Sequence, residues 1–149
     1  MARGIPRNID YFHVFAADIM VRLYSAFPVP EDLDFEAFDF EGIFPDEDRD
    51  RLAKIWAHSV RWLRSEGIIR VDAAAGDGDD QFLGVVLTEK GFRILNRPTD
   101  LHANLKLGES LAISMNDPVT ETGRNHIREQ VDEIFGGGDD TRTSDETGN

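Results

Sequence analysis

The stretches Trp62-Leu-Arg-Ser-Glu-Gly-Ile-Ile-Arg70 and Leu87-Thr-Glu-Lys-Gly91 decide the fold. In the first, Gly67 ends a helical pattern, because glycine readily adopts the left-handed conformation that follows a helix, and the β-branched residues after it predict a strand. In the second, Thr88 follows a strand pattern and is a residue type that caps helices. The two stretches therefore predict a helix, a pair of strands and another helix, in that order.

A β-hairpin is predicted between the two stretches. The runs 68–72 and 81–87 are rich in β-branched and aromatic residues. The segment between them contains glycine and aspartate, which favour turns. The tip of this hairpin carries three acidic residues and no basic one, namely Asp77, Asp79 and Asp80.

Two regions before these stretches also form elements. In residues 9–26, which follow Asn8 as a predicted N-cap, apolar residues recur at helical spacing and the other faces are apolar too. This helix must be covered on several sides, either within the domain or by a second copy. Segment 33–44 interleaves acids with large apolar residues, and we expect a short helix over 34–40. Its aromatic residues either complete the core, which we expect, or form an acidic aromatic docking surface; they are Phe35, Phe38 and Phe40.

A longer helix is predicted over residues 47–65. Pro45 and the acids after it mark its start, because proline and negative charge are favoured in the first turn. Its inward stripe consists of Leu52, Ile55 or Trp56, Ser59 or Val60, and Leu63. A second, basic stripe consists of Arg51, Lys54, His58 and Arg61. This basic face is a DNA-reading surface, a solvated face with pairs such as Asp50 and Lys54, or a contact with the acidic segment of a second copy.

The chain beyond Pro98 predicts two further helices, over 105–115 and 119–135. The stripe Ile127, Val131 and Ile134 fits either a dimer interface or packing onto the same domain. Residues 136–149 are glycine-rich and polar, so they lack the apolar surface that would offset the entropic cost of ordering. We therefore expect them to be disordered.

The phrase Glu66-Gly-Ile-Ile-Arg70, the hairpin and Leu87-Thr-Glu-Lys-Gly91 together resemble the winged helix-turn-helix superfamily, and the wing is most similar to that of MarR-type regulators. The resemblance covers about residues 9–96. It implies an α+β, mainly α fold of three helices and a two- or three-stranded β-wing, with additional C-terminal helices. We expect a winged-helix domain over 1–98, a helical extension over 99–135, with homodimerisation as one alternative, and an acidic tail over 136–149.

One position departs from the family pattern. In that family an Asp-x-Arg element precedes Leu-Thr-x-x-Gly, and here Asp79 stands at the aspartate position while Gln81 stands at the arginine position. The resemblance implies that the arginine enters the minor groove, where negative potential favours a guanidinium. Gln81 can donate a hydrogen bond but supplies no charge, so we expect a weak wing contact with DNA.

Composition excludes several functional classes. The 149 residues include no cysteine, which excludes disulfides, thiol nucleophiles and thiolate-bound metals. No apolar run reaches the roughly 20 residues that span a bilayer, so we expect a cytoplasmic protein without a membrane partner. The formal net charge of −13 repels nucleic acid on average. The charge is segregated, however, with nine acids and no Lys or Arg in 31–48, and five bases and one acid in 49–64.

The sequence contains no recognisable catalytic or metal-binding pattern. Its four histidines lack metal-ligand spacing, and none is expected beside a hydroxyl nucleophile. It also lacks a phosphate-cradling glycine motif and a nucleophile-elbow motif. We expect no enzymatic activity, no cofactor and no metal.

Two functions remain. The first is a bacterial or phage transcriptional regulator that reads duplex DNA through helix 47–65. Its candidate contacts are Arg49, Arg51, Lys54, His58, Arg61 and Arg64, with Gln81 on the wing. The alternative is an acidic winged-helix module for protein–protein interaction, acting as an adaptor, inhibitor or DNA mimic. It would bind a basic protein through 31–48 and the wing, and would not bind DNA.

Overall fold

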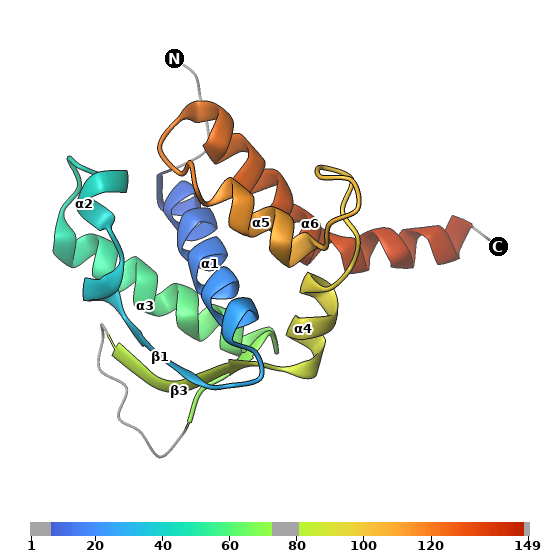
Figure 1. Cartoon of the computed structure of the whole chain (residues 1–149), viewed down its shortest axis with the longest axis horizontal. Helices are drawn as coiled ribbons and strands as arrows, with labels where there is room; N and C mark the ends of the chain where they lie inside the picture. Colours follow the sequence, from blue (N-terminus) through green and yellow to red (C-terminus); the bar gives the residue numbers. More distant parts are fainter. Residues whose placement is uncertain (1–6, 73–80, 148–149) are drawn as a thin grey trace.

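The computed structural model describes residues 7–72 and 81–147, without the side chains of Phe40 and residues 137–147, and this part of the chain is α+β and mainly helical (Figure 1). The elements, in chain order, are α1 (Arg7–Ala26), β1 (Glu31–Asp34), the 3-10 turn η1 (Phe35–Ala37), α2 (Phe40–Ile43), α3 (Arg49–Ser65), β2 (Ile69–Arg70), β3 (Gln81–Leu87), α4 (Glu89–Leu95), α5 (Leu107–Ser114) and α6 (Glu121–Thr147).

Helix α1 lies at the centre of the molecule. It contacts α3 and strand β3 on one side and α5 and α6 on the other (Figure 1). Its buried residues occupy more than one face: Val14, Phe15, Ala16, Ala17, Ile19, Met20 and Leu23 are all at most 1% exposed. The expectation that this helix is covered on several sides is confirmed, and elements of the same chain provide the cover.

The strands form one antiparallel sheet in the order β1-β3-β2. The expected helix over 34–40 is wrong, because β1 extends to Asp34, the 3-10 turn η1 spans only Phe35–Ala37, and α2 begins at Phe40. The alternation is that of a strand with one buried face, since Leu33 is buried while Asp32 and Asp34 are exposed. Leu33 lies opposite Phe82 of β3. Pairing with a distant strand thus decides the conformation of this acidic segment.

Two of the three phenylalanines that we expect in the core, Phe35 and Phe38, are buried there. Phe35 is fully buried and Phe38 is 4% exposed. Both pack edge-on against Phe15 of α1, with ring centroids 6.2 Å and 5.0 Å away. The side chain of Phe40 lies outside the described part.

The glycine and threonine that the sequence assigns to helix ends, Gly67 and Thr88, stand at the end of α3 and at the start of α4. Gly67 has a φ of +79° directly after α3. The Thr88 hydroxyl accepts a hydrogen bond from the amide of Gly91 at 3.0 Å and caps α4. A Cβ at position 91 would lie 2.3 Å from the carbonyl oxygen of Ile68, so α4 can approach the strand this closely only with glycine there.

Two helices begin at residues other than those predicted. Helix α3 starts at Arg49, because the carboxylate of Asp48 accepts a hydrogen bond from the amide of Arg51 and makes Asp48 the N-cap. Helix α1 starts at Arg7, so Asn8 lies inside the helix and does not cap it. Both differences fall within the one or two residues by which helix ends commonly vary.

The C-terminal helices pack onto the same chain. Ile127, Val131 and Ile134 of α6 are at most 3% exposed and join the core that contains α1. Helix α6 continues to Thr147, where the sequence predicts a disordered tail from residue 136, and its last part projects away from the other elements (Figure 1). Extending an existing helix costs less than starting one, because its nucleus is already formed.

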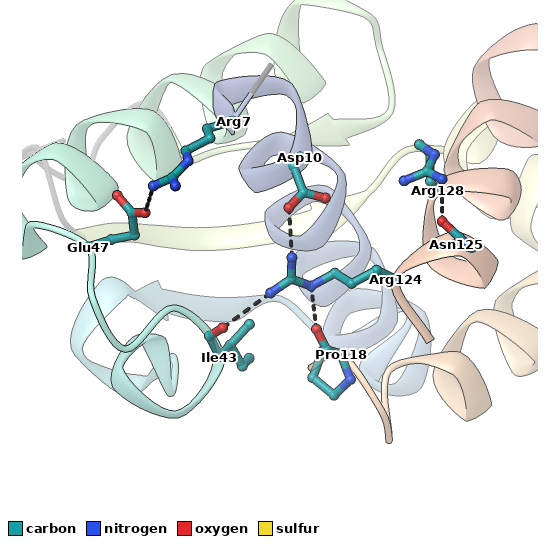
Figure 2. Close-up of polar contacts among 8 residues, drawn as sticks. All are labelled: Arg7, Asp10, Ile43, Glu47, Pro118, Arg124, Asn125 and Arg128. Atoms are coloured by element: carbon teal, nitrogen blue, oxygen red, sulfur yellow. Dashed lines mark hydrogen bonds and ion pairs between the residues drawn. The ribbon is translucent and has the colours of Figure 1, made fainter. Parts of the chain in front are cut away.

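One arginine of α6 connects α1 with the segment that leads into α3. Nη1 of Arg124 on α6 lies 2.7 Å from a carboxylate oxygen of Asp10 on α1, and Nη2 donates to the Ile43 carbonyl at 3.1 Å (Figure 2). Its Nε also donates to the carbonyl of Pro118, and its guanidinium lies 4.7 Å from the ring centroid of Phe44. This clasp ties the segment that leads into α3 to α1 and α6.

We predict that Arg124→Met destabilises the protein by about 2 kcal/mol, because it leaves a carboxylate and two carbonyls without their donor. Arg93→Met is the matched control, since Arg93 pairs with Glu89 on the surface with both side chains at least 75% exposed. That variant should cost less than about 0.5 kcal/mol. Urea unfolding measures both, and equal losses would show that the clasp contributes no more than a surface pair.

Candidate nucleic-acid interface

Helix α3 has one buried face and one outward face. Its buried residues are Leu52, Ala53, Trp56, Ala57, Ser59, Val60 and Leu63. They include the whole predicted inward stripe, with Trp56 buried at the position where the sequence left Ile55 or Trp56 open. The helix contacts α1, η1 and β2. The remaining face of α3 points away from the core and carries the predicted basic stripe.

Three members of the basic stripe are open to solvent. Arg51, Lys54 and His58 are exposed and lie three and four residues apart, so their side chains share one face. Arg64, in the last turn, is exposed as well. None of these four side chains forms an ion pair or a hydrogen bond with any residue in the described ranges 7–72 and 81–147. They are available for an external anion.

Two other predicted contacts are engaged within the molecule. Arg49 pairs with Glu36, has Asp50 at 3.4 Å, and lies 5.4 Å from the ring centroid of Phe35. The guanidinium of Arg61 lies 5.5 Å from the ring centroid of Phe82. Asp50 thus lies beside Arg49, whereas the alternative of a solvated face paired it with Lys54. Both arginines would have to exchange partners before they could bind DNA.

Gln81 is exposed at the first position of β3, opposite Asp34 of β1. It therefore stands at the base of the hairpin, where the sequence predicts a wing contact. The acidic residues predicted at the tip, Asp77, Asp79 and Asp80, lie outside the described part.

The acidic segment lies beside the start of α3. Its exposed members are Glu31, Asp32, Asp34, Glu36, Asp39, Glu41, Asp46 and Asp48. The pair between Glu36 and Arg49 joins this segment to the first turn of the helix. Acidic side chains therefore flank the start of the outward face of α3.

A histidine does lie beside a serine, which corrects the sequence-based expectation. Nδ1 of His102 is within hydrogen-bond reach of the Ser110 hydroxyl, which also accepts from the amide of Gln130. Gln130 in turn accepts from the Ser114 hydroxyl at 2.6 Å. Ser110 and Gln130 are fully buried, so this network has no access for a substrate and serves to join α5 to α6.

Among the described residues, the titratable groups with clearly perturbed pKa values lie on α1. Burial raises the pKa of the Asp18 carboxyl, although the guanidinium of Arg22, with Nε 2.8 Å from a carboxylate oxygen, opposes this effect. Burial also raises the pKa of Tyr24, whose hydroxyl donates to Asn96 at 3.0 Å. Both effects follow from packing and do not involve the outward face of α3.

Comparisons with known proteins give no match: no family model, no curated protein and no solved structure is detectably similar to this chain. Among the described residues, no three acidic or histidine side chains are grouped so that they could hold a metal ion. Within the same ranges, none of the helices has both the length and the apolar character needed to cross a bilayer.

We predict that alanine substitutions distinguish the open cations from the engaged ones. Arg61→Ala should cost about 1 kcal/mol, because it removes the contact with Phe82 and the packing of the arginine stem. Lys54→Ala on the same helix should change stability by less than about 0.5 kcal/mol. Urea unfolding measures both, and a loss for Lys54→Ala as large as that for Arg61→Ala would mean that Lys54 is also engaged.

Proposed function

We propose that this protein is a winged-helix module that binds duplex DNA through the outward face of α3 and acts as a transcriptional regulator. The order of elements supports the winged-helix assignment: helix, strand, two helices, then two strands of a hairpin, with a three-stranded sheet ordered β1-β3-β2. In such a module the third helix is the one that enters the major groove. Here that helix is α3.

The observation that carries the proposal is the open cationic stripe. Arg51, Lys54 and His58 project from the face of α3 opposite its buried side and have no partner in the described part of the chain. Arg51 and Lys54 are residue types that read guanine edges or bind phosphates. Arg64 adds a contact for the DNA backbone, and Gln81 stands where a wing would meet the minor groove.

The charge of the molecule limits how this binding works. With a net charge of −13, nonspecific attraction to DNA is small, and the exposed acids around η1 repel phosphates. Three phosphate contacts give a salt slope of about −3 in a plot of log K against log salt concentration. We therefore propose selective binding to a short site through few contacts.

A second candidate function is supported by the exposed acids of segment 31–48. Arg49 at the start of α3 is already paired with Glu36, while Asp32, Asp34 and Asp39 of the same acidic segment are exposed. Such a surface suits a basic protein partner, as an adaptor, inhibitor or DNA mimic. This module would not bind DNA.

Selection from a random duplex pool at about 50 mM and about 200 mM salt tests the proposal, because these concentrations separate specific from nonspecific binding. We expect a short motif to be enriched. On that motif, the double variant Arg51→Glu with Lys54→Glu should bind at least about tenfold more weakly, since two phosphate or base contacts become repulsive.

The control variant is Arg93→Glu with Lys106→Glu, which changes the net charge equally at exposed positions on α4 and before α5. It should bind the enriched motif with nearly the wild-type affinity. Failure of any duplex to be enriched at either salt concentration contradicts DNA binding and favours the acidic module. Equal losses in the two double variants would mean that net charge, and not α3, determines the affinity.

A further inference from the structure

A shallow apolar groove runs between the first turns of α1 and the middle of α3. It has a volume of about 490 Å3 and is lined by Asn8, Ile9, Phe12, Lys54, Ile55, His58, Ser59 and Trp62. Two of its large apolar side chains are unusually open, since Ile9 is 41% and Trp62 is 39% exposed. Exposed apolar side chains grouped in a groove are typical of an interaction site.

The walls of the groove are firmly held. Phe12 packs edge-on against Trp62 at 5.1 Å between ring centroids, and Trp62 packs edge-on against Phe135 of α6 at 4.9 Å. Three helices therefore fix the orientation of Trp62. The exposed part of its ring is a preformed surface, so binding would cost little side-chain ordering.

One edge of the groove is cationic. Lys54 and His58 line it, and both side chains are exposed and without partners among the described residues. The lining contains no acidic residue. An occupant that matches this site has an apolar face and an acidic flank.

The shape of the groove favours a helix over a small molecule. The stretch from Lys54 to Trp62 spans about 12 Å of helix axis, which equals about two helical turns. Two neighbouring helices with an apolar floor between them form the surface on which an amphipathic helix docks. A small ligand, by contrast, needs a site that buries most of its surface, and the exposure of Ile9 and Trp62 shows that this groove is too open.

Two acidic segments of the chain do not match these requirements. Residues 136–149 contain no aliphatic or aromatic side chain, so the acidic end of the chain cannot fill an apolar floor. The acidic segment of a second copy has its apolar residues Leu33, Phe35 and Phe38 buried in its own core. Two copies that met through this groove would bring two cationic edges together, which is unfavourable.

We propose that this groove binds an acidic amphipathic helix of another protein, with its apolar face on Ile9, Phe12 and Trp62 and its carboxylates beside Lys54 and His58. Because these two residues also belong to the DNA-binding stripe, the helix and the DNA exclude each other. The helix would act as an antagonist that replaces phosphates with carboxylates. The docking itself is independent of the proposed function, and only the competition rests on it.

The test uses the full chain and a designed helical peptide of about 16 residues with leucine or phenylalanine at i, i+3, i+4 and i+7 and glutamate on the flanks. One comparison peptide carries lysine in place of glutamate, and another has the acidic sequence scrambled. Anisotropy of labelled peptide gives affinity at about 150 mM salt, where long-range repulsion is screened. Tryptophan emission reports the groove, because Trp62 is 39% exposed and Trp56 only 2%.

We expect the acidic peptide to bind at least about tenfold more tightly than either comparison peptide, although the net charge of −13 favours the lysine peptide. Lys54→Glu and Ile9→Gln should each weaken binding of the acidic peptide by about threefold or more, since each removes a contact with the peptide. Arg64→Glu should leave it unchanged, because Arg64 does not line the groove.

Equal binding of the acidic and lysine peptides, binding of the scrambled peptide, or absence of binding would each overturn the proposal. An effect of Arg64→Glu as large as that of Lys54→Glu would do the same, because it would indicate general electrostatics. The two proposals fail separately. Arg64→Glu should weaken DNA binding but not peptide binding, and Ile9→Gln should weaken peptide binding but not DNA binding. If the protein binds the peptide but no DNA, only the proposal of a DNA-binding regulator is refuted.

Discussion

The fold depends on the need to cover α1. Because Val14, Phe15, Ile19 and Met20 occupy more than one side of this helix and are all fully buried, no single partner layer can cover it. Helix α3 and the sheet cover one side, and α5 and α6 cover the other (Figure 1). Burial of large apolar side chains, at about 1.5–3 kcal/mol each, is the dominant stabilising contribution in such a core. Residues 7–95 and the C-terminal helices therefore share one core.

This arrangement also determines what α3 can present. Helix α3 buries one face against α1 and leaves the opposite face open to solvent. Arg51, Lys54 and His58 lie on that open face. The Arg124 clasp fixes the segment that leads into the helix (Figure 2). Trp62 fixes the position of the helix relative to α1 and α6. A cationic face on a rigid support, next to an apolar groove, can serve two competing anionic partners. The same two side chains, Lys54 and His58, connect both proposals.

The parts of the fold that follow from local signals could be predicted from the sequence, and those that depend on distant contacts could not. Gly67 marks the end of α3 and Thr88 the start of α4 through their own conformational preferences. The β-branched residues of the hairpin predict its strands. Strand β1 has only Leu33 as a buried residue, and its pairing partner lies some fifty residues away, so no local pattern distinguishes it from a helix. At the candidate site, spacing predicted the basic stripe. The engagement of Arg49 and Arg61 depends on side chains from other elements, as does the groove beside Trp62.

Helix α1 joins α3, the sheet, α5 and α6 in one core, and this core holds α3 in place. Native-state hydrogen exchange of the full chain tests this coupling, because it gives an opening free energy for each protected amide. We expect the slowest amides of α1, of α3 and of residues 127–134 in α6 to open with the same free energy, equal to that of global unfolding. A much lower opening free energy for α6 than for α1 and α3 would contradict it, because the C-terminal helices would then form a separate unit that α3 does not need.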